Sequence, residues 1–224
     1  MKSEFSGFSK NTLTFLKNLE ANNTKPWFEA HRQEYEAYLR QPLQALAADL
    51  GDFMLRIDPY FEVTPNRAVS RIYRDTRFAR DKSPYKTTMW ITFKHPNPNW
   101  QDAPAYFFEL AADSYRYGMG FYSASKQTMD KLRDQIDQEP DKFRQAISFY
   151  AGQQMFVVEG DTYKKQPPNP KPPEIMEWYW RKNLYLVCNC PINDRLFNRA
   201  LLTDLMDGFK LLAPLYHYLW RIND

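Results

Sequence analysis

Apolar residues recur at helical spacing over residues 9–58, where three leucines follow Ser9 and an aromatic stripe follows Pro26. Ser9 is a typical N-cap, and a proline such as Pro26 suits the first turn of a helix. Pro42 interrupts the pattern, so we expect a break or kink there and a further helix that ends near Asp58. The first part of the chain is therefore predicted to be helical.

The middle of the chain changes to aromatic and β-branched runs, separated by Pro, Asn, Asp and Ser. These runs predict antiparallel strands at Met89–Phe93, Ala105–Leu110 and Tyr115–Tyr122. The segment Ala112–Ser114 is typical of a tight turn between the last two strands, so the simplest arrangement is a meander.

Helical spacing returns after these strands. The pattern predicts helices opened by Ser125 and Pro140, strands at Gln154–Val158 and Leu184–Cys188, a proline-rich loop at Gly160–Pro173 and a short helix at Glu174–Lys182. Asn193 or Asp194 can cap a long apolar helix that Pro214 bends.

Together these elements predict a single α+β domain over residues 1–224, with a largely antiparallel sheet flanked by helices and a long C-terminal helix. Helices precede and follow a block of consecutive strands, which favours α+β over a parallel α/β sheet. The predicted parts are a helical segment at 9–58, a basic motif with strands at 65–122, helices and strands at 125–190, and the C-terminal helix at 193–221.

Composition excludes several classes of protein. A net charge of +3 is too close to neutral for a chain whose whole surface follows nucleic acid. Two cysteines exclude a disulfide framework and favour a reducing compartment, so we expect the cytoplasm. The sequence has neither an N-terminal apolar stretch of signal-peptide length nor the roughly 20 apolar residues of a membrane span, so we expect neither secretion nor a membrane partner.

One basic segment carries the strongest chemical signal. Pro65–Lys86 contains seven basic and two acidic residues, a net charge of +5, which leaves −2 for the rest of the chain. The planar fork of arginine suits two-pronged binding of phosphate or carboxylate. The candidate ligand-binding residues, with the aspartates in an orienting role, are Arg71, Arg74, Asp75, Arg77, Asp81, Lys82, Tyr85 and Lys86.

Several functions are compatible with this segment. The first is a pocket for a small phosphorylated or carboxylated ligand; nucleic acid is compatible but less favoured. The second is an enzyme acting on phosphate esters or nucleic acid, which would be favoured by a carboxylate cluster, such as Asp75, Asp81 and Glu109, that converges and binds Mg²⁺. The third is an aromatic-rich interaction module, in which exposed Trp178, Tyr179 and Trp180 would suit a protein or single-stranded nucleic-acid partner. The same arginines and aspartates can also form a purely structural ion-pair network.

The sequence leaves open whether any reaction is catalysed. A carboxylate among arginines is a poor general base, whereas Tyr73, Tyr85 or Lys82 beside several cations would lose a proton more easily. Cys188 and Cys190 share a face of a predicted strand, but no second Cys or His pair lies nearby, so we predict no metal and no cofactor.

The run Arg71–Phe78 followed by Asp81–Lys86 closely resembles the signature of the family known as domain of unknown function 2461. Other parts of that family's pattern are present at Phe15-Leu16-Leu19 with Asn22-Asn23, Trp27-Phe28, Tyr117–Tyr122, and Leu132-Arg133 with Ile136. The resemblance covers nearly the whole chain and departs at Tyr163–Pro173. It implies a single domain of mixed helix and sheet in soluble proteins, and no established activity, so the ligand and the oligomeric state stay open.

Overall fold

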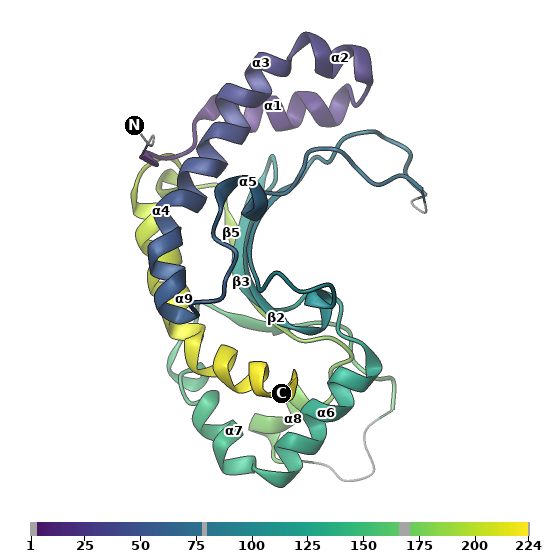
Figure 1. Ribbon diagram of the computed structural model, residues 1–224, viewed down its shortest axis with the longest axis vertical. Helices are drawn as coiled ribbons and strands as arrows, with labels where there is room; N and C mark the ends of the chain where they lie inside the picture. Colours follow the sequence, from purple (N-terminus) through teal and green to yellow (C-terminus); the bar gives the residue numbers. More distant parts are fainter. Residues whose placement is uncertain (1–3, 78–79, 166–170, 224) are drawn as a thin grey trace. The chain divides into compact units, whose positions relative to one another are not determined.

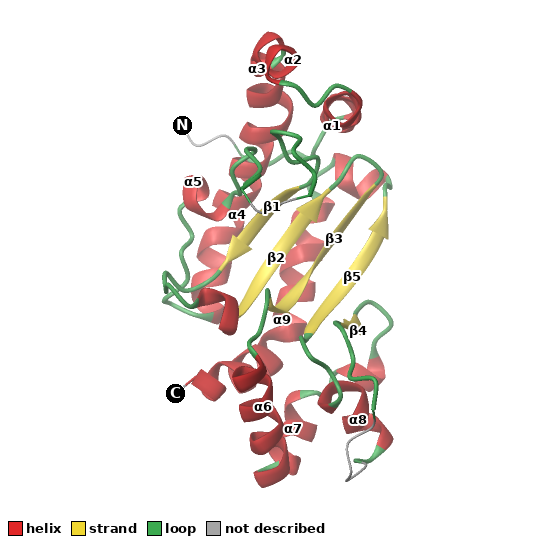
Figure 2. Ribbon diagram, turned by 90° about the vertical axis from the view of Figure 1, so that its right-hand side faces the viewer, coloured by secondary structure: helices red, strands yellow, loops and turns green. Residues whose placement is uncertain are grey.

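The chain folds into helices and one five-stranded antiparallel sheet (Figures 1 and 2). The computed structural model describes residues 4–77, 80–165 and 171–223. The helices are α1 (Lys10–Ala21), α2 (Lys25–Ala30), α3 (Arg32–Tyr35), α4 (Gln41–Ile57), α5 (Pro65–Ala68), α6 (Lys126–Gln138), α7 (Pro140–Ala146), α8 (Pro173–Tyr179) and α9 (Ala200–Trp220). The strands are β1 (Met89–Phe93), β2 (Pro104–Leu110), β3 (Ser114–Phe121), β4 (Val157–Glu159) and β5 (Tyr185–Pro191). The predicted α+β class is confirmed, with α9 as the long C-terminal helix.

The described residues belong to two compact units. Unit 1 comprises Met1–Phe93, Phe107–Arg116 and Asn189–Met206, and unit 2 comprises Lys94–Tyr106, Tyr117–Cys188 and Asp207–Asp224. Strands β2, β3 and β5 and helix α9 therefore contribute residues to both units. The single domain predicted for residues 1–224 stays a prediction.

The strands follow the order β1-β2-β3-β5-β4 (Figure 2), which confirms the predicted meander of the first three. The amide of Ala111 donates to the carbonyl of Ser114 at 2.9 Å, so the tight turn between β2 and β3 also lies where we expect it. In unit 2, a Cβ added at Gly118 would lie only 1.9 Å from the carbonyl oxygen of Leu186. Strand β5 therefore approaches β3 closely because this position has no side chain.

In unit 1, the buried Thr12 takes part in the cap of α1 and also bonds to the backbone just before α4. Ser9 and Thr12 form a reciprocal capping box at the start of α1. The interruption predicted at Pro42 is a π-helical turn at Glu36–Arg40, directly before α4. Because Pro42 has no N–H for the carbonyl of Tyr38 four residues earlier, that carbonyl needs another donor. The hydroxyl of Thr12, which is fully buried, donates to it at 2.6 Å.

In unit 2, aromatic side chains from several elements make the core. Phe209 of α9 packs edge-on against Tyr106 of β2, with ring centroids 5.1 Å apart. Trp178 of α8 is fully buried and packs against Tyr150 at 5.0 Å. Trp178 therefore belongs to the core and is not available to a partner, whereas Tyr179 and Trp180 are partly exposed.

The C-terminal helix begins later than the predicted 193–221. Asn193 caps a 3-10 turn at Asp194–Phe197, and Asn198 is extended with φ −146° and ψ 177°, so the helix cannot run through it. The side chain of Asn198 instead accepts a hydrogen bond from the amide of Ala200, where α9 begins. Of the helices that the structure describes, none has the length and apolar character needed to cross a membrane.

Candidate functional site

The basic segment forms an irregular two-stranded ribbon in unit 1, before β1 (Figure 1). The amide of Lys86 donates to the carbonyl of Ile72 at 2.8 Å, and the amide of Arg74 donates to the carbonyl of Pro84 at 2.9 Å. These bonds pair residues 72–74 with residues 84–86 as antiparallel partners, with Tyr73 opposite Tyr85. We call residues 70–77 and 80–86 the basic ribbon.

Tyr85 anchors the basic ribbon to α1 and α2. Its ring is almost fully buried and stacks on Phe28, with centroids 4.1 Å apart. Its amide donates to the side chain of Asn23, whose amide group donates back to the Tyr85 carbonyl, both at 3.0 Å. Burial, followed by the nearby Tyr73 and Glu29, raises the pKa of Tyr85. The expectation that Tyr85 would lose its proton easily is therefore wrong, because burial outweighs the cations.

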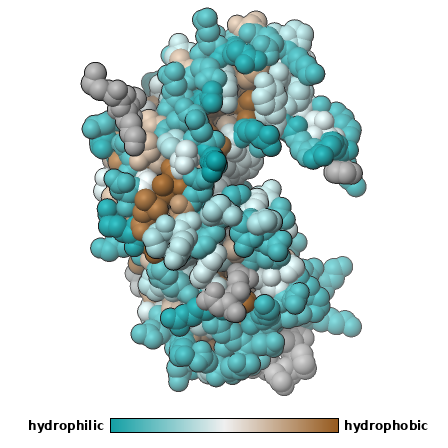
Figure 3. All heavy atoms as spheres, viewed as in Figure 1, coloured by the Kyte–Doolittle hydropathy of each residue, from teal (hydrophilic) through white to brown (hydrophobic). Residues whose placement is uncertain are grey.

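The tip of the basic ribbon is held by its own side chains. Arg77 donates to Asp75 from Nε at 3.0 Å and from Nη2 at 2.7 Å. The hydrogen bonds from Arg77 lower the pKa of Asp75 to about 2. Lys82 donates from Nζ to the carbonyl of Thr76 at 2.8 Å. Figure 3 shows hydrophilic residues over this end of the ribbon, which the internal bonds keep in shape.

Asp81 links this tip to Arg74. The amide and hydroxyl of Ser83 donate to Asp81 at 2.9 and 2.8 Å, and these bonds, more than the charge of Arg74, lower the pKa of Asp81. Nη1 of Arg74 forms an ion pair with the same carboxylate. Its Nε is buried and meets no acceptor among the described residues. Asp81 therefore pairs with Arg74, and the orienting role that the sequence predicts for the aspartates stays a prediction.

Arg71, Arg74 and Lys86 form a cluster of positive charge. Lys86 is partly buried, and burial, followed by the charges of Arg71 and Arg74, lowers its pKa. Within residues 4–77, 80–165 and 171–223, neither Arg71 nor Lys86 has a carboxylate at ion-pair distance. The structure thus brings these three candidates together, whereas Asp75, Arg77, Lys82 and Tyr85 bond elsewhere.

A row of polar side chains continues from this cluster across the sheet of unit 1. Lys86 places Nζ 5.6 Å from the ring centroid of Trp90 in β1. Nε1 of Trp90 donates to Oε2 of Glu109 in β2 at 2.6 Å, and Nη2 of Arg116 in β3 donates to the same oxygen at 2.7 Å. Trp90, Glu109 and Arg116, which we call the polar row, occupy the partly exposed positions of strands whose alternate residues are buried.

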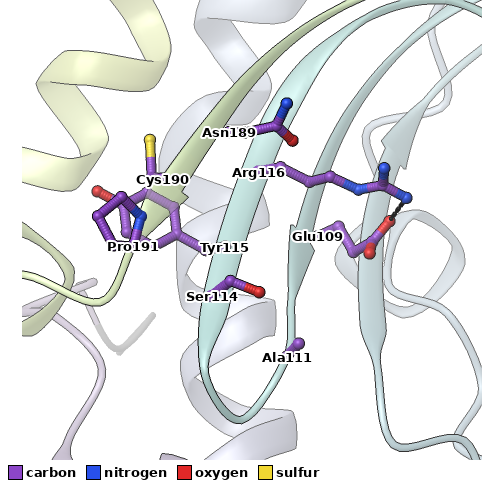
Figure 4. Close-up of a pocket in the computed structure, with 8 residues that line it drawn as sticks. All are labelled: Glu109, Ala111, Ser114, Tyr115, Arg116, Asn189, Cys190 and Pro191. Carbon is purple, nitrogen blue, oxygen red and sulfur yellow. Dashed lines mark hydrogen bonds and ion pairs between the residues drawn. The ribbon is translucent and has the colours of Figure 1, made fainter. Parts of the chain in front are cut away.

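The polar row borders a cavity of about 500 Å³ (Figure 4). Its lining comes from β2, β3, β5 and the turn between the first two: Glu109, Ala111, Ser114, Tyr115, Arg116, Asn189, Cys190 and Pro191. Figure 4 shows the side chains of Glu109 and Arg116 meeting over the sheet. Neither Trp90 nor Arg116 is among the candidate residues that the sequence predicts. The available signal for Arg116 was a charged residue between two tyrosines of an apolar strand.

Asp75, Asp81 and Glu109, the carboxylates that would favour an enzyme if they converged on a metal, form no such cluster in the part of the chain that the structure describes. Asp75 pairs with Arg77, Asp81 with Arg74, and Glu109 with Arg116, so each carboxylate has its own cation. Among the residues described here, no group of three or more His, Cys, Asp or Glu is placed to hold a metal ion.

Comparison with known proteins gives a family and no activity. The chain matches the family model described as conserved hypothetical protein (DUF2461) over residues 11–218, nearly its whole length. A search of curated proteins finds no match. The family resemblance of the basic motif is therefore confirmed, and the chain belongs to the DUF2461 family of conserved hypothetical proteins.

Proposed function

We propose that unit 1 binds a small ligand through its phosphate or carboxylate group, at Arg71, Arg74 and Lys86. The observation that carries the proposal is the partly buried Lys86 beside two arginines, with no carboxylate at ion-pair distance of Lys86 or Arg71 among the described residues. The positive charges of Lys86, Arg71 and Arg74 repel one another because Lys86 is only partly exposed to water, and a bound anion would relieve that repulsion. An oxyanion can also accept paired N–H bonds from each guanidinium.

The other predicted residues of the basic ribbon support the site rather than contact the anion. Asp81 orients Arg74, and the Asp75–Arg77 pair and Lys82 shape the tip. Tyr85 anchors the strand that carries Lys86. The structural ion-pair interpretation therefore accounts for Arg77 and part of Arg74. Among the described residues it gives neither Arg71 nor Lys86 an ion pair, and the charge of Arg71 acts on Asp75 only at longer range.

The cluster favours a compact anion over a polyanion. Three cations beside one tryptophan contact few phosphates, whereas tight binding of duplex DNA at physiological salt draws on many released counterions. A small phosphate or carboxylate ligand is therefore the proposed partner.

Titration with inorganic phosphate and with citrate at low ionic strength tests the proposal. We expect Lys86→Ala and Arg71→Ala each to weaken binding about tenfold, because a hydrogen bond to a charged group contributes roughly 1.5–3 kcal/mol. Lys17→Ala is the matched control, since Lys17 is exposed on α1 and should leave the affinity unchanged. No binding by the unaltered protein, or equal losses in all three variants, contradicts the proposal.

A further inference from the structure

Glu109 has one oxygen engaged and the other open. Oε2 accepts both hydrogen bonds, from Trp90 at 2.6 Å and from Arg116 at 2.7 Å. Oε1 accepts no hydrogen bond from any residue that the structure describes. The side chain is only 14% exposed, and two donors on one oxygen fix its orientation, so Oε1 keeps a defined position at the cavity.

The cavity at Glu109 has the size and the lining of a site for a small polar molecule. Its volume of about 500 Å³ lies within the usual range for ligand pockets, roughly 300–1,000 Å³. Arg116 and Asn189 line it beside Glu109 (Figure 4). Carboxylate, guanidinium and amide groups are suited to hydrogen-bonding a hydroxylated compound.

The charges around Glu109 favour a neutral ligand group over a charged one as the hydrogen-bond donor to Oε1. Arg116 already compensates the carboxylate, so no second cation is needed there. Lys86 lies over the Trp90 ring, and Arg71 and Arg74 act on Lys86, so a ligand ammonium group would meet repulsion. A neutral hydroxyl can donate to Oε1 without that cost.

We propose that Oε1 of Glu109 accepts a hydrogen bond from a hydroxyl of the bound ligand, which makes the ligand class phosphorylated or carboxylated polyols. This inference rests on the proposed anion site: Lys86 lies against Trp90, and Trp90 donates to Glu109, so the polar row connects the basic ribbon with the cavity. Trp90 and Arg116 are positioning residues that hold Glu109 in place.

Two phosphate esters that differ only in hydroxyls test the inference. In NMR titrations of the full chain, glycerol 3-phosphate should bind about tenfold more tightly than n-propyl phosphate, as one hydrogen bond to a carboxylate allows. Glu109→Gln replaces the charged acceptor with a neutral amide and should reduce that ratio to about threefold or less. Glu20→Gln, the same change at an exposed position of α1, should leave the ratio unaltered.

A second probe pair needs no variant and therefore does not depend on the folding of Glu109→Gln. 2-Hydroxyethyl phosphate and 2-methoxyethyl phosphate keep the same oxygen, and only the first can donate a proton to Glu109. We expect the first to bind more tightly. Equal affinities within both probe pairs, or an unchanged ratio in folded Glu109→Gln, overturn the inference and leave the anion site standing. Binding of none of the four esters overturns the inference together with the proposed function.

Discussion

Replacing Trp90 with phenylalanine removes one donor from the centre of the polar row and leaves the rest of the strand in place. The indole Nε1 donates to Glu109 at 2.6 Å, and the Glu109 side chain is 14% exposed. A hydrogen bond to a charged group contributes roughly 1.5–3 kcal/mol. We therefore expect Trp90→Phe to lower the free energy of unfolding by about 2 kcal/mol, or the melting temperature by roughly 4–8 °C in a chain of this size.

The smaller phenylalanine ring also loses packing, so the single variant does not isolate the hydrogen bond. A double-mutant cycle with Glu109→Met, measured by urea denaturation, removes the packing contribution. The ion pair of Arg116 with Glu109 is lost in both Glu109→Met backgrounds, so that loss cancels as well. We expect a coupling free energy of about 1–2 kcal/mol between Trp90 and Glu109.

A coupling of less than about 0.5 kcal/mol would refute this reasoning, since additive sites agree within about that amount. It would mean that Trp90 does not hold Glu109 in solution. The defined position of Oε1, on which the polyol inference depends, would then have lost one of its two supports.

Two further predictions concern the helices of unit 1 and the tip of the basic ribbon. Thr12→Val removes the hydroxyl that donates to the carbonyl of Tyr38, and it should lower the free energy of unfolding, measured by urea denaturation, by about 1–3 kcal/mol. Thr14→Val, at an exposed threonine of the same helix, should lower it by less than about 0.5 kcal/mol. Equal losses in the two variants would contradict the account of Pro42. Side-chain NMR should give Asp75 a pKa of about 2, and Arg77→Ala should raise it. Because the pKa of Asp75 is lower in the folded protein, the stability that this ion pair contributes is present above the ordinary aspartate pKa and is lost as the pH falls toward about 2. A pKa of Asp75 that is unaltered in Arg77→Ala would contradict the ion pair.

The positions of most helices and strands could be predicted because their signals are local. Ser125 caps α6 and Pro140 opens α7, as the spacing of apolar residues and the residue types indicate. The start of α9 could not be predicted, because Asn193 and Asn198 are both good caps and the choice depends on a distant segment. Gly7, with φ +117°, lies so close to Phe197 that a Cβ there would be 2.3 Å from its backbone carbon, and this contact accompanies the extended turn before α9.

The candidate site was only partly predictable. Charge density located the basic ribbon, since no other segment departs so far from neutrality. The polar row joins side chains from three strands, and its members meet only when the register of the sheet is known. Part of that register follows from the turn at Ala111–Ser114, because counting back equally along both strands sets Glu109 opposite Arg116. The contact of Lys86 with Trp90 depends on the irregular ribbon, for which the sequence has no comparable rule.

The net charge of the basic segment is therefore less informative than the way its charges are paired. Arg67 pairs with Glu62 at 2.9 Å, Arg77 with Asp75, and Arg74 with Asp81, and all three acids lie within seven residues of their partners. These short-range pairs compensate Arg67 before the basic ribbon, and Arg74 and Arg77 within it. Among the described residues, Arg71, Arg80, Lys82 and Lys86 have no ion pair. Of these, Lys86 lies beside Trp90 of the polar row, and the charge of Arg71 acts on Lys86. Acids close in sequence to a cation thus determine which arginines stay available to a ligand, and the aspartates of this motif are as important to the proposed site as its arginines.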